Sequence, residues 1–189
     1  MVSGEIKMLF NQLFNMIVFK IYPTVSGKNL RINGRINRRG RGKVIIGDYV
    51  TINSSKKSNI LGGNDYSTIY ARRDAEVVIG NNVGISNACI IAFEEIKIGD
   101  NVLIGADCKI YDTDFHSLDC NLRGKIEDDK PRCAPITIED HAFIGAHSII
   151  LKGVTIGKCS IVGAGSVVTH NIPEHEIWAG NPAKFIRKC

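Results

Sequence analysis

The sequence predicts an all-β protein whose short strands stack into a parallel β-helix. Over most of the chain an aliphatic residue returns every six positions, and the fifth position of each six-residue unit is mostly small. Glycine, asparagine or aspartate recurs where each unit would turn. A period of six fits neither an α-helix nor a simple strand alternation. Because one unit cannot bury its own aliphatic residue, the units must stack to form a shared core.

Residues 1–24 are expected to form a helix ahead of this stack. Apolar residues recur there at helical spacing, with Asn11, Gln12, Asn15 and Lys20 on other faces. The apolar set is Ile6, Leu9, Phe10, Leu13, Ile17 and Ile21. Pro23 ends the pattern. A stack needs its first coil covered, so we expect the helix to cap it or to pack against another subunit. Lying on a membrane surface is the alternative.

Residues 25–173 are expected to form the β-helix itself. From residue 138 the chain reads "IEDHAF IGAHSI ILKGVT IGKCSI VGAGSV VTHNIP", and "IGNNVG ISNACI" and "IGDNVL IGADCK" repeat the pattern upstream. The first positions of the later block are Ile138, Ile144, Ile150, Ile156, Val162 and Val168. We expect three units per triangular coil, with each first residue pointing to the axis. Repeated glycine and β-branched residues oppose a helical interpretation.

Two segments depart from the repeat. After Ile110 it stops, and an extended loop at 111–135 begins with "YDTDFHSLD", which carries His116. Pro173 ends the last unit, and we expect residues 174–189 to form a short tail outside the repeats.

The net charge of +5 is concentrated near the N-terminus, because no acidic residue lies between Glu5 and Asp48. The basic run at 28–43 is suited to an anionic polymer, a membrane surface or a phosphorylated ligand, and we hypothesise an anionic glycan or a lipid-phosphate-linked sugar. The alternative is a charged face that protects an exposed edge. The six cysteines show no CxxC and no framework spacing, which favours a reducing compartment. We also recognise no secretory signal and no spanning segment, so we expect a cytoplasmic location.

The repeats, the looped histidine and the ending "WAGNPAKFIRK" together resemble the hexapeptide-repeat acyltransferases. The resemblance extends from about Ile46 to Lys188 and is closest to the sugar O-acetyltransferases, including those that modify bacterial surface polysaccharides. It implies a left-handed β-helix and a homotrimer with an active site in each cleft between subunits. It also implies acetyl-CoA as co-substrate, with no metal expected.

The resemblance identifies His116 as the catalytic general base, a role that suits a neutral imidazole near pH 7. A backbone carbonyl, Asp112, Asp114 or Asp119 is a candidate to orient its ring, and we favour Asp114. Asn87 aligns with an asparagine that contacts the reacting groups in galactoside and maltose acetyltransferases. A neighbouring aspartate of those enzymes is Ala92 here, which argues against a simple free sugar as acceptor.

The donor side is also inferred from the resemblance. It places Gly145, Ala146, Gly163 and Ala164 along the pantetheine arm of acetyl-CoA. It places Thr169, His170, Lys184 and Arg187 near the nucleotide end, where cations suit phosphates. Phe143 stands where many relatives carry tryptophan, and keeps an aromatic wall without the indole N–H.

The resulting prediction is an O-acetyltransferase that acetylates a sugar hydroxyl in surface polysaccharide synthesis, such as capsule, exopolysaccharide or lipopolysaccharide. Its partners would be a sugar or polysaccharide acceptor and two further copies of the chain, with no nucleic acid. N-acetylation of an amino sugar and a non-catalytic binding or scaffold protein are the alternatives. A zinc enzyme of the γ-carbonic-anhydrase type is disfavoured, because His141 and His147 are six residues apart and should lie on different faces of the coil.

Overall fold

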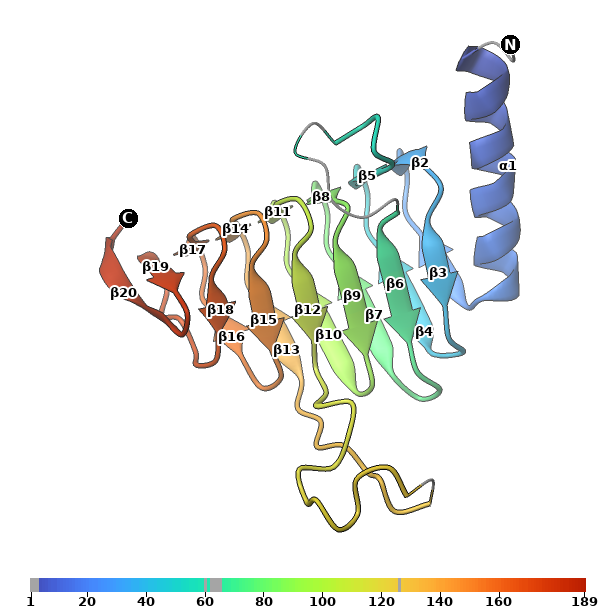
Figure 1. The fold of residues 1–189 in the computed structure, drawn as a ribbon. Helices are drawn as coiled ribbons and strands as arrows, with labels where there is room; N and C mark the ends of the chain where they lie inside the picture. Colours follow the sequence, from blue (N-terminus) through green and yellow to red (C-terminus); the bar gives the residue numbers. More distant parts are fainter. Residues whose placement is uncertain (1–3, 60, 62–65, 126) are drawn as a thin grey trace.

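The computed structural model describes residues 4–59, 61, 66–125 and 127–189. One helix, α1 (Gly4–Ile21), is followed by a chain that winds through three parallel sheets, called here faces A, B and C. Apart from the first coil and the antiparallel last strand, each strand pairs in parallel with the strand one coil earlier, and the stack of coils is plain in Figure 1. Successive turns therefore line up along three edges, which we name A–B, B–C and C–A after the faces they join.

The strands follow the same order around every coil. Face A holds β1 (Thr24–Ser26), β4 (Lys43–Ile46), β7 (Glu76–Ile79), β10 (Glu95–Ile98), β13 (Ile136–Ile138) and β16 (Thr155–Ile156). Face B holds β2 (Arg31–Gly34), β5 (Thr51–Ser54), β8 (Gly84–Ser86), β11 (Leu103–Ile104), β14 (Phe143–Ile144), β17 (Ile161–Val162), β19 (Glu176–Gly180) and β20 (Ala183–Lys188). Face C holds β3 (Asn37–Arg39), β6 (Thr68–Ala71), β9 (Cys89–Ala92), β12 (Lys109–Tyr111), β15 (Ile149–Leu151) and β18 (Val167–Val168).

The core is the row of aliphatic residues that the repeat predicts. The first residues of all six units from Ile138 to Val168 are at most 1% exposed, and they stack in register, as in Ile104 against Ile144. The fifth residues of those units are buried as well, next to the edges. The prediction of a parallel β-helix built from hexapeptide units is confirmed.

Arg38 shows that the basic run is not wholly a surface feature. Its side chain is 2% exposed and enters the first coil, where its guanidinium donates to the carbonyl oxygens of Pro23 and Gly42 and to Thr24 Oγ1. Burial lowers the pKa of Arg38 to about 10. A buried cation is tolerated here because carbonyl oxygens replace its water.

The helix α1 stands beside the first coil, at the opposite end of the stack from β19 and β20 (Figure 1). The helical spacing predicted α1, but it did not indicate which side would meet the coil. The side chains buried against the coil are Asn15 and Val18, with Asn11 and Phe19 partly buried. Asn15 makes two hydrogen bonds to the backbone, one to Gly34 O and one from the Ile36 N–H, both at 3.0 Å.

The C-terminal residues are not separate from the repeats, in contrast to the expectation for 174–189. β19 pairs in parallel with β17 and so extends face B, and β20 folds back on β19 as an antiparallel strand. The Gly163 N–H donates to Trp178 O, and the Trp178 ring packs against the core. This hairpin covers the last coil because Trp178 and the buried Ala183 supply apolar surface there.

Candidate active site

The loop that interrupts the repeat leaves the C–A edge after β12 and returns before β13. Its two ends pair through an isolated bridge between Thr113 and Cys133. Asp112, which is fully buried at the start of the loop, accepts the N–H groups of Phe93 and Glu94 at 2.7 and 2.8 Å. Burial raises the pKa of this carboxyl in spite of those hydrogen bonds. The loop is thus tied to the preceding coil at its base, and it projects well away from the stack (Figure 1).

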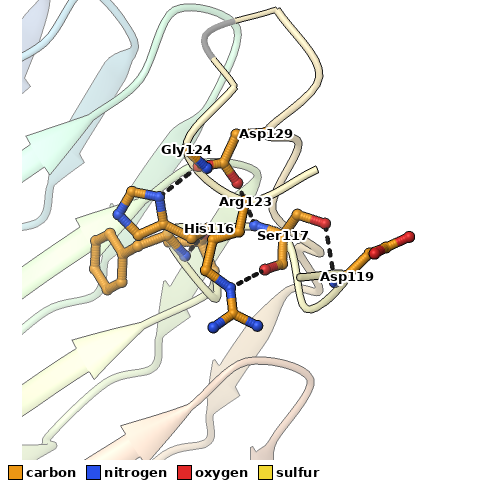
Figure 2. A network of polar contacts seen from close by, with 8 residues as sticks. His116, Ser117, Asp119, Arg123, Gly124 and Asp129 are labelled. Carbon is orange, nitrogen blue, oxygen red and sulfur yellow. Dashed lines mark hydrogen bonds and ion pairs between the residues drawn. The ribbon is translucent and has the colours of Figure 1, made fainter. Parts of the chain in front are cut away.

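His116 and Asp129 form the centre of the loop. His116 Nδ1 lies 2.7 Å from Asp129 Oδ2, and the same carboxylate accepts the N–H groups of Ser117 and Gly124 (Figure 2). These contacts lower the pKa of Asp129 to about 2, with the Ser117 N–H as the largest cause and His116 next. With Nδ1 directed at a carboxylate, Nε2 is the nitrogen left to accept a proton. The His116 side chain is 68% exposed, so a substrate can reach it.

The prediction that Asp114 orients His116 is wrong in this structure. Asp114 Oδ1 instead lies 3.0 Å from Lys152 Nζ in the next coil. Asp119 accepts the N–H of Asn121 within its own turn, and Asp112 is occupied as described above. The sequence does not predict this role for Asp129, although it lies in "EDDKP" of the same loop. A 13-residue separation inside an irregular loop offers no spacing rule that would select it.

An aromatic ladder leads from the coil to the histidine. Phe115 stacks edge-on against Tyr111 and Phe93, with ring centroids 5.2 and 5.9 Å apart, and Tyr70 lies 6.1 Å from Phe93. Phe115 has a φ of +64°, which is unusual for a bulky residue. The guanidinium of Arg72 lies 5.2 Å from the centre of the Phe93 ring. The ladder therefore fixes the position of Phe115, the residue directly before His116.

The other residues implied by the resemblance occupy different parts of the coil. Asn87, Gly145, Ala146, Gly163 and Ala164 all lie on the B–C edge, whereas the His116 loop leaves the C–A edge. The Asn87 side chain is fully buried in that edge, and the backbone N–H of Asn87 donates to Asn53 O. One chain thus does not bring Asn87 and His116 together.

The remaining donor candidates are divided between face B and the C–A edge. Phe143 is 43% exposed on face B, and Lys184 and Arg187 are exposed on its last strand, β20. Thr169 and His170 lie on the C–A edge, where Thr169 Oγ1 is 2.8 Å from His170 Nδ1.

The small residues of the B–C edge leave space for the donor to approach the backbone. A Cβ on Gly145 would lie 2.5 Å from Ala164 N, so coil stacking alone requires this glycine. Ala164 is exposed and Ala146 is half-buried one coil away, so a ligand could approach the backbone closely there. The residues present are compatible with the amide-rich arm of coenzyme A along this edge.

The four histidines outside the loop do not gather into a metal site in the part of the chain that the structure describes. His141 lies on the A–B edge and His147 on the B–C edge, where its Nδ1 is 3.6 Å from Asp107 Oδ2. Among the described residues, no three histidine, cysteine, aspartate or glutamate side chains gather as a possible metal site.

Comparisons with known proteins agree with this architecture. The family model for the hexapeptide repeat of succinyl-transferase matches residues 95–110 and 135–170. Galactoside O-acetyltransferase of Escherichia coli K12 is 36% identical over 121 residues, which cover 64% of this chain and 58% of that protein. The chain spans between 43% and 59% of the length of the first curated relatives it matches.

Solved structures extend the likeness to nearly the whole chain. A maltose O-acetyltransferase from Clostridium difficile 630 has a TM-score of 0.62 and 26% identity, over 97% of this chain and 84% of that one. A galactoside acetyltransferase in complex with coenzyme A has a TM-score of 0.60 and 25% identity, over 100% of this chain and 84% of that one. The chain is thus a left-handed parallel β-helix, and its resemblance to the hexapeptide-repeat acyltransferases is confirmed.

Proposed function

We propose that this chain, which shares its repeats and its fold with the hexapeptide-repeat acyltransferases, transfers an acetyl group from acetyl-CoA to a sugar hydroxyl. The observation that carries the proposal is the His116–Asp129 contact of 2.7 Å on a loop that projects from the coil. A carboxylate on Nδ1 is the arrangement that prepares the opposite nitrogen, Nε2, to act as a base. The names of the galactoside and maltose enzymes support a sugar as acceptor.

The proposed chemistry assigns the loop a proton-transfer role. His116 Nε2 takes the proton of the acceptor hydroxyl as its oxygen attacks the acetyl carbonyl of the thioester. Asp129 accepts the Nδ1–H throughout, so it keeps the ring in one tautomer and stabilises the imidazolium that forms. His116 then returns the proton to the departing thiolate of coenzyme A. The acetyl-CoA supplies the activated acyl group, and Phe143, Ala146, Ala164, Lys184 and Arg187 would hold it.

A second copy of the chain would complete the site. The proposed base lies off the C–A edge and the proposed donor edge is B–C, so the two meet when different copies pack side by side. A closed homotrimer supplies three such contacts with identical geometry. We place the reaction in the cytoplasm, because all six cysteines are free thiols, which suits a reducing compartment.

The aromatic ladder is the proposed acceptor side. Sugar rings bind on exposed aromatic faces through their C–H groups, and Phe115 is 39% exposed next to His116. Arg72 on Phe93 and Arg39, the registered neighbour of Tyr70, place cations at the far end of the ladder. This favours an acceptor with a negative charge near the acetylated sugar, such as an acidic surface polysaccharide or its phosphate-linked precursor.

The experiment that tests the proposal is acetyl transfer from acetyl-CoA to a panel of neutral and acidic sugars, amino sugars and oligosaccharides. Thiol release would be measured beside the identification of the acetylated product. His116→Ala should lower kcat by about 10²- to 10⁴-fold, the range for loss of a general base. His175→Ala is the control and should stay active, because His175 is exposed on the A–B edge, away from the His116 loop and the B–C edge. Equal rates for His116→Ala and wild type would refute the base, and an amide product would identify N-acetylation instead.

A further inference from the structure

The outer face of α1 is apolar, and none of the other residues that the structure describes covers it. Nine large apolar side chains along residues 8–25 are 37–64% exposed. They are Met8, Leu9, Phe10, Leu13, Phe14, Met16, Ile17, Ile21 and Val25. Soluble monomers rarely expose so large a continuous apolar surface unless it binds something.

Polar contacts hold α1 in this orientation. Asn15 bonds to the backbone of Gly34 and Ile36, and Arg35 Nε donates to Asn11 Oδ1 at 3.0 Å. Rotation of the helix to bury its apolar side would break these three hydrogen bonds and would bury polar side chains. The apolar side is therefore built to face away from the coil.

Cations surround this apolar face. Lys7 and Lys20 are exposed on α1 itself, and the Arg35 guanidinium lies 4.9 Å from the centre of the Phe14 ring. A groove of about 1280 Å³ runs along the helix between Met8 and Met16 on one side and Arg31 and Lys57 on the other. No acidic residue occurs between Glu5 and Asp48, so every charged side chain from Lys7 to Lys43 is positive.

We propose that α1 and its flanking cations form a docking surface for an anionic lipid bilayer. A helix lies in the headgroup region when its apolar side chains enter the acyl boundary and its cations meet lipid phosphates. A second copy of the chain fits less well, because self-association through this face would bring cations against cations. Among the described residues, no helix is long and apolar enough to cross a bilayer, so the contact would be peripheral.

The position of α1 sets the geometry of docking. The helix stands across one end of the stack, far from the C-terminal hairpin (Figure 1). Docking through α1 would therefore place the coil axis perpendicular to the plane of the membrane and keep the His116 loop above its surface. This placement would suit an acceptor carried on a membrane lipid, although the docking surface stands without the proposed activity.

The test is co-sedimentation of the full chain with vesicles of phosphatidylcholine alone or with about one third phosphatidylglycerol. We expect at least a tenfold preference for the anionic vesicles at low salt, and its loss in about 0.5 M NaCl. Leu13→Gln with Ile17→Gln should lower binding by about tenfold or more. Lys7→Glu with Lys20→Glu should do the same through charge alone. Ile186→Gln and Lys158→Glu, which are exposed at the other end of the stack, should bind as wild type.

Two further measurements separate a loss of membrane binding from a loss of folding and from a change in the number of subunits. Circular dichroism and thermal unfolding must show that each variant is folded, which is expected because every changed side chain is exposed. Light scattering would record the number of subunits. Equal binding to neutral and anionic vesicles, or no binding to either, would overturn the proposal. A change in subunit number in the Leu13 and Ile17 variant, without vesicle binding by wild type, would assign the face to contact between copies.

Discussion

His116 and Asp129 lie 13 residues apart in the sequence, and their contact decides which ring nitrogen is free to accept a proton. Asp129 also accepts the backbone N–H groups of Ser117 and Gly124, so one carboxylate positions both the ring and the loop around it. A substitution here would change the tautomer as well as the position of His116. We therefore propose that Asp129 positions His116, a role that experiment can separate from a purely structural one.

Asp129→Asn should lower kcat by about 10²-fold or more and should change the KM for acetyl-CoA little. The amide NH₂ would face Nδ1, which favours the tautomer with its proton on Nε2, the nitrogen that must act as base. Asp128→Asn, the exposed neighbour, is the matched control. A variant that keeps full kcat while its thermal unfolding is unchanged would contradict the assigned role.

The contacts of the Asp129 carboxylate in the wild-type loop have a defined pH dependence. Because the folded pKa of Asp129 is lowered to about 2, its ionised contacts are present above the unfolded value of about 3.9 and are lost as the pH falls through about 2. Asp129 thus does not titrate in the working range, and the wild-type loop contacts should hold from about pH 5 upward. Any loss of kcat between about pH 5 and 7 would then not be due to protonation of Asp129.

Among the elements of the fold, the aromatic ladder connects the coil to the loop that carries His116. Its rings come from β6, β12, the turn after β9 and the loop, so they gather only when the coils stack. The repeat spacing predicts the strands, but it does not indicate that these outward-facing rings touch. The positive φ of Phe115 follows from the sharp turn that presents His116.

Phe93→Leu should raise the KM for the acceptor about three- to tenfold, which corresponds to the loss of one aromatic contact of about 0.5–1.5 kcal/mol. The KM for acetyl-CoA should stay unchanged, because the residues proposed to hold it (Phe143, Ala146, Ala164, Lys184 and Arg187) lie on face B and the B–C edge. Phe93→Tyr keeps the ring and should behave as wild type. Initial rates measured with each substrate varied in turn make this comparison. A rise in the KM for acetyl-CoA alone would show that the aromatic ladder does not bind the acceptor.

Within one chain, the residues of the candidate site are divided between two edges of the β-helix. The His116 loop leaves the C–A edge and the small residues Ala146 and Ala164 lie on the B–C edge. If neighbouring copies pair these edges, each active site takes its base from one chain and its donor surface from the next. This arrangement can be tested without a structure of the assembly.

His116→Ala and Ala164→Tyr should each be inactive, because the first lacks the base and the second blocks the donor edge. Equal amounts of the two, dissociated and reassembled together, should recover about one quarter of wild-type activity, since one site in four combines two intact edges. The double variant in a single chain, reassembled with His116→Ala, is the control and should stay inactive. Mixed oligomers that form without any recovered activity would place the whole site within one chain.

Four features could be predicted from the sequence: the β-helix, the buried row from Ile138 to Val168, the helix at the N-terminus and the loop that carries His116. These features depend on a period of six and on local turn residues, and both can be read directly from one sequence. Three features could be seen only in the folded chain: Asp129 and not Asp114 contacts His116, Arg38 enters the first coil, and α1 turns its apolar side outward. Each of these depends on contacts between residues in different coils or across an irregular loop, where no period relates one position to another.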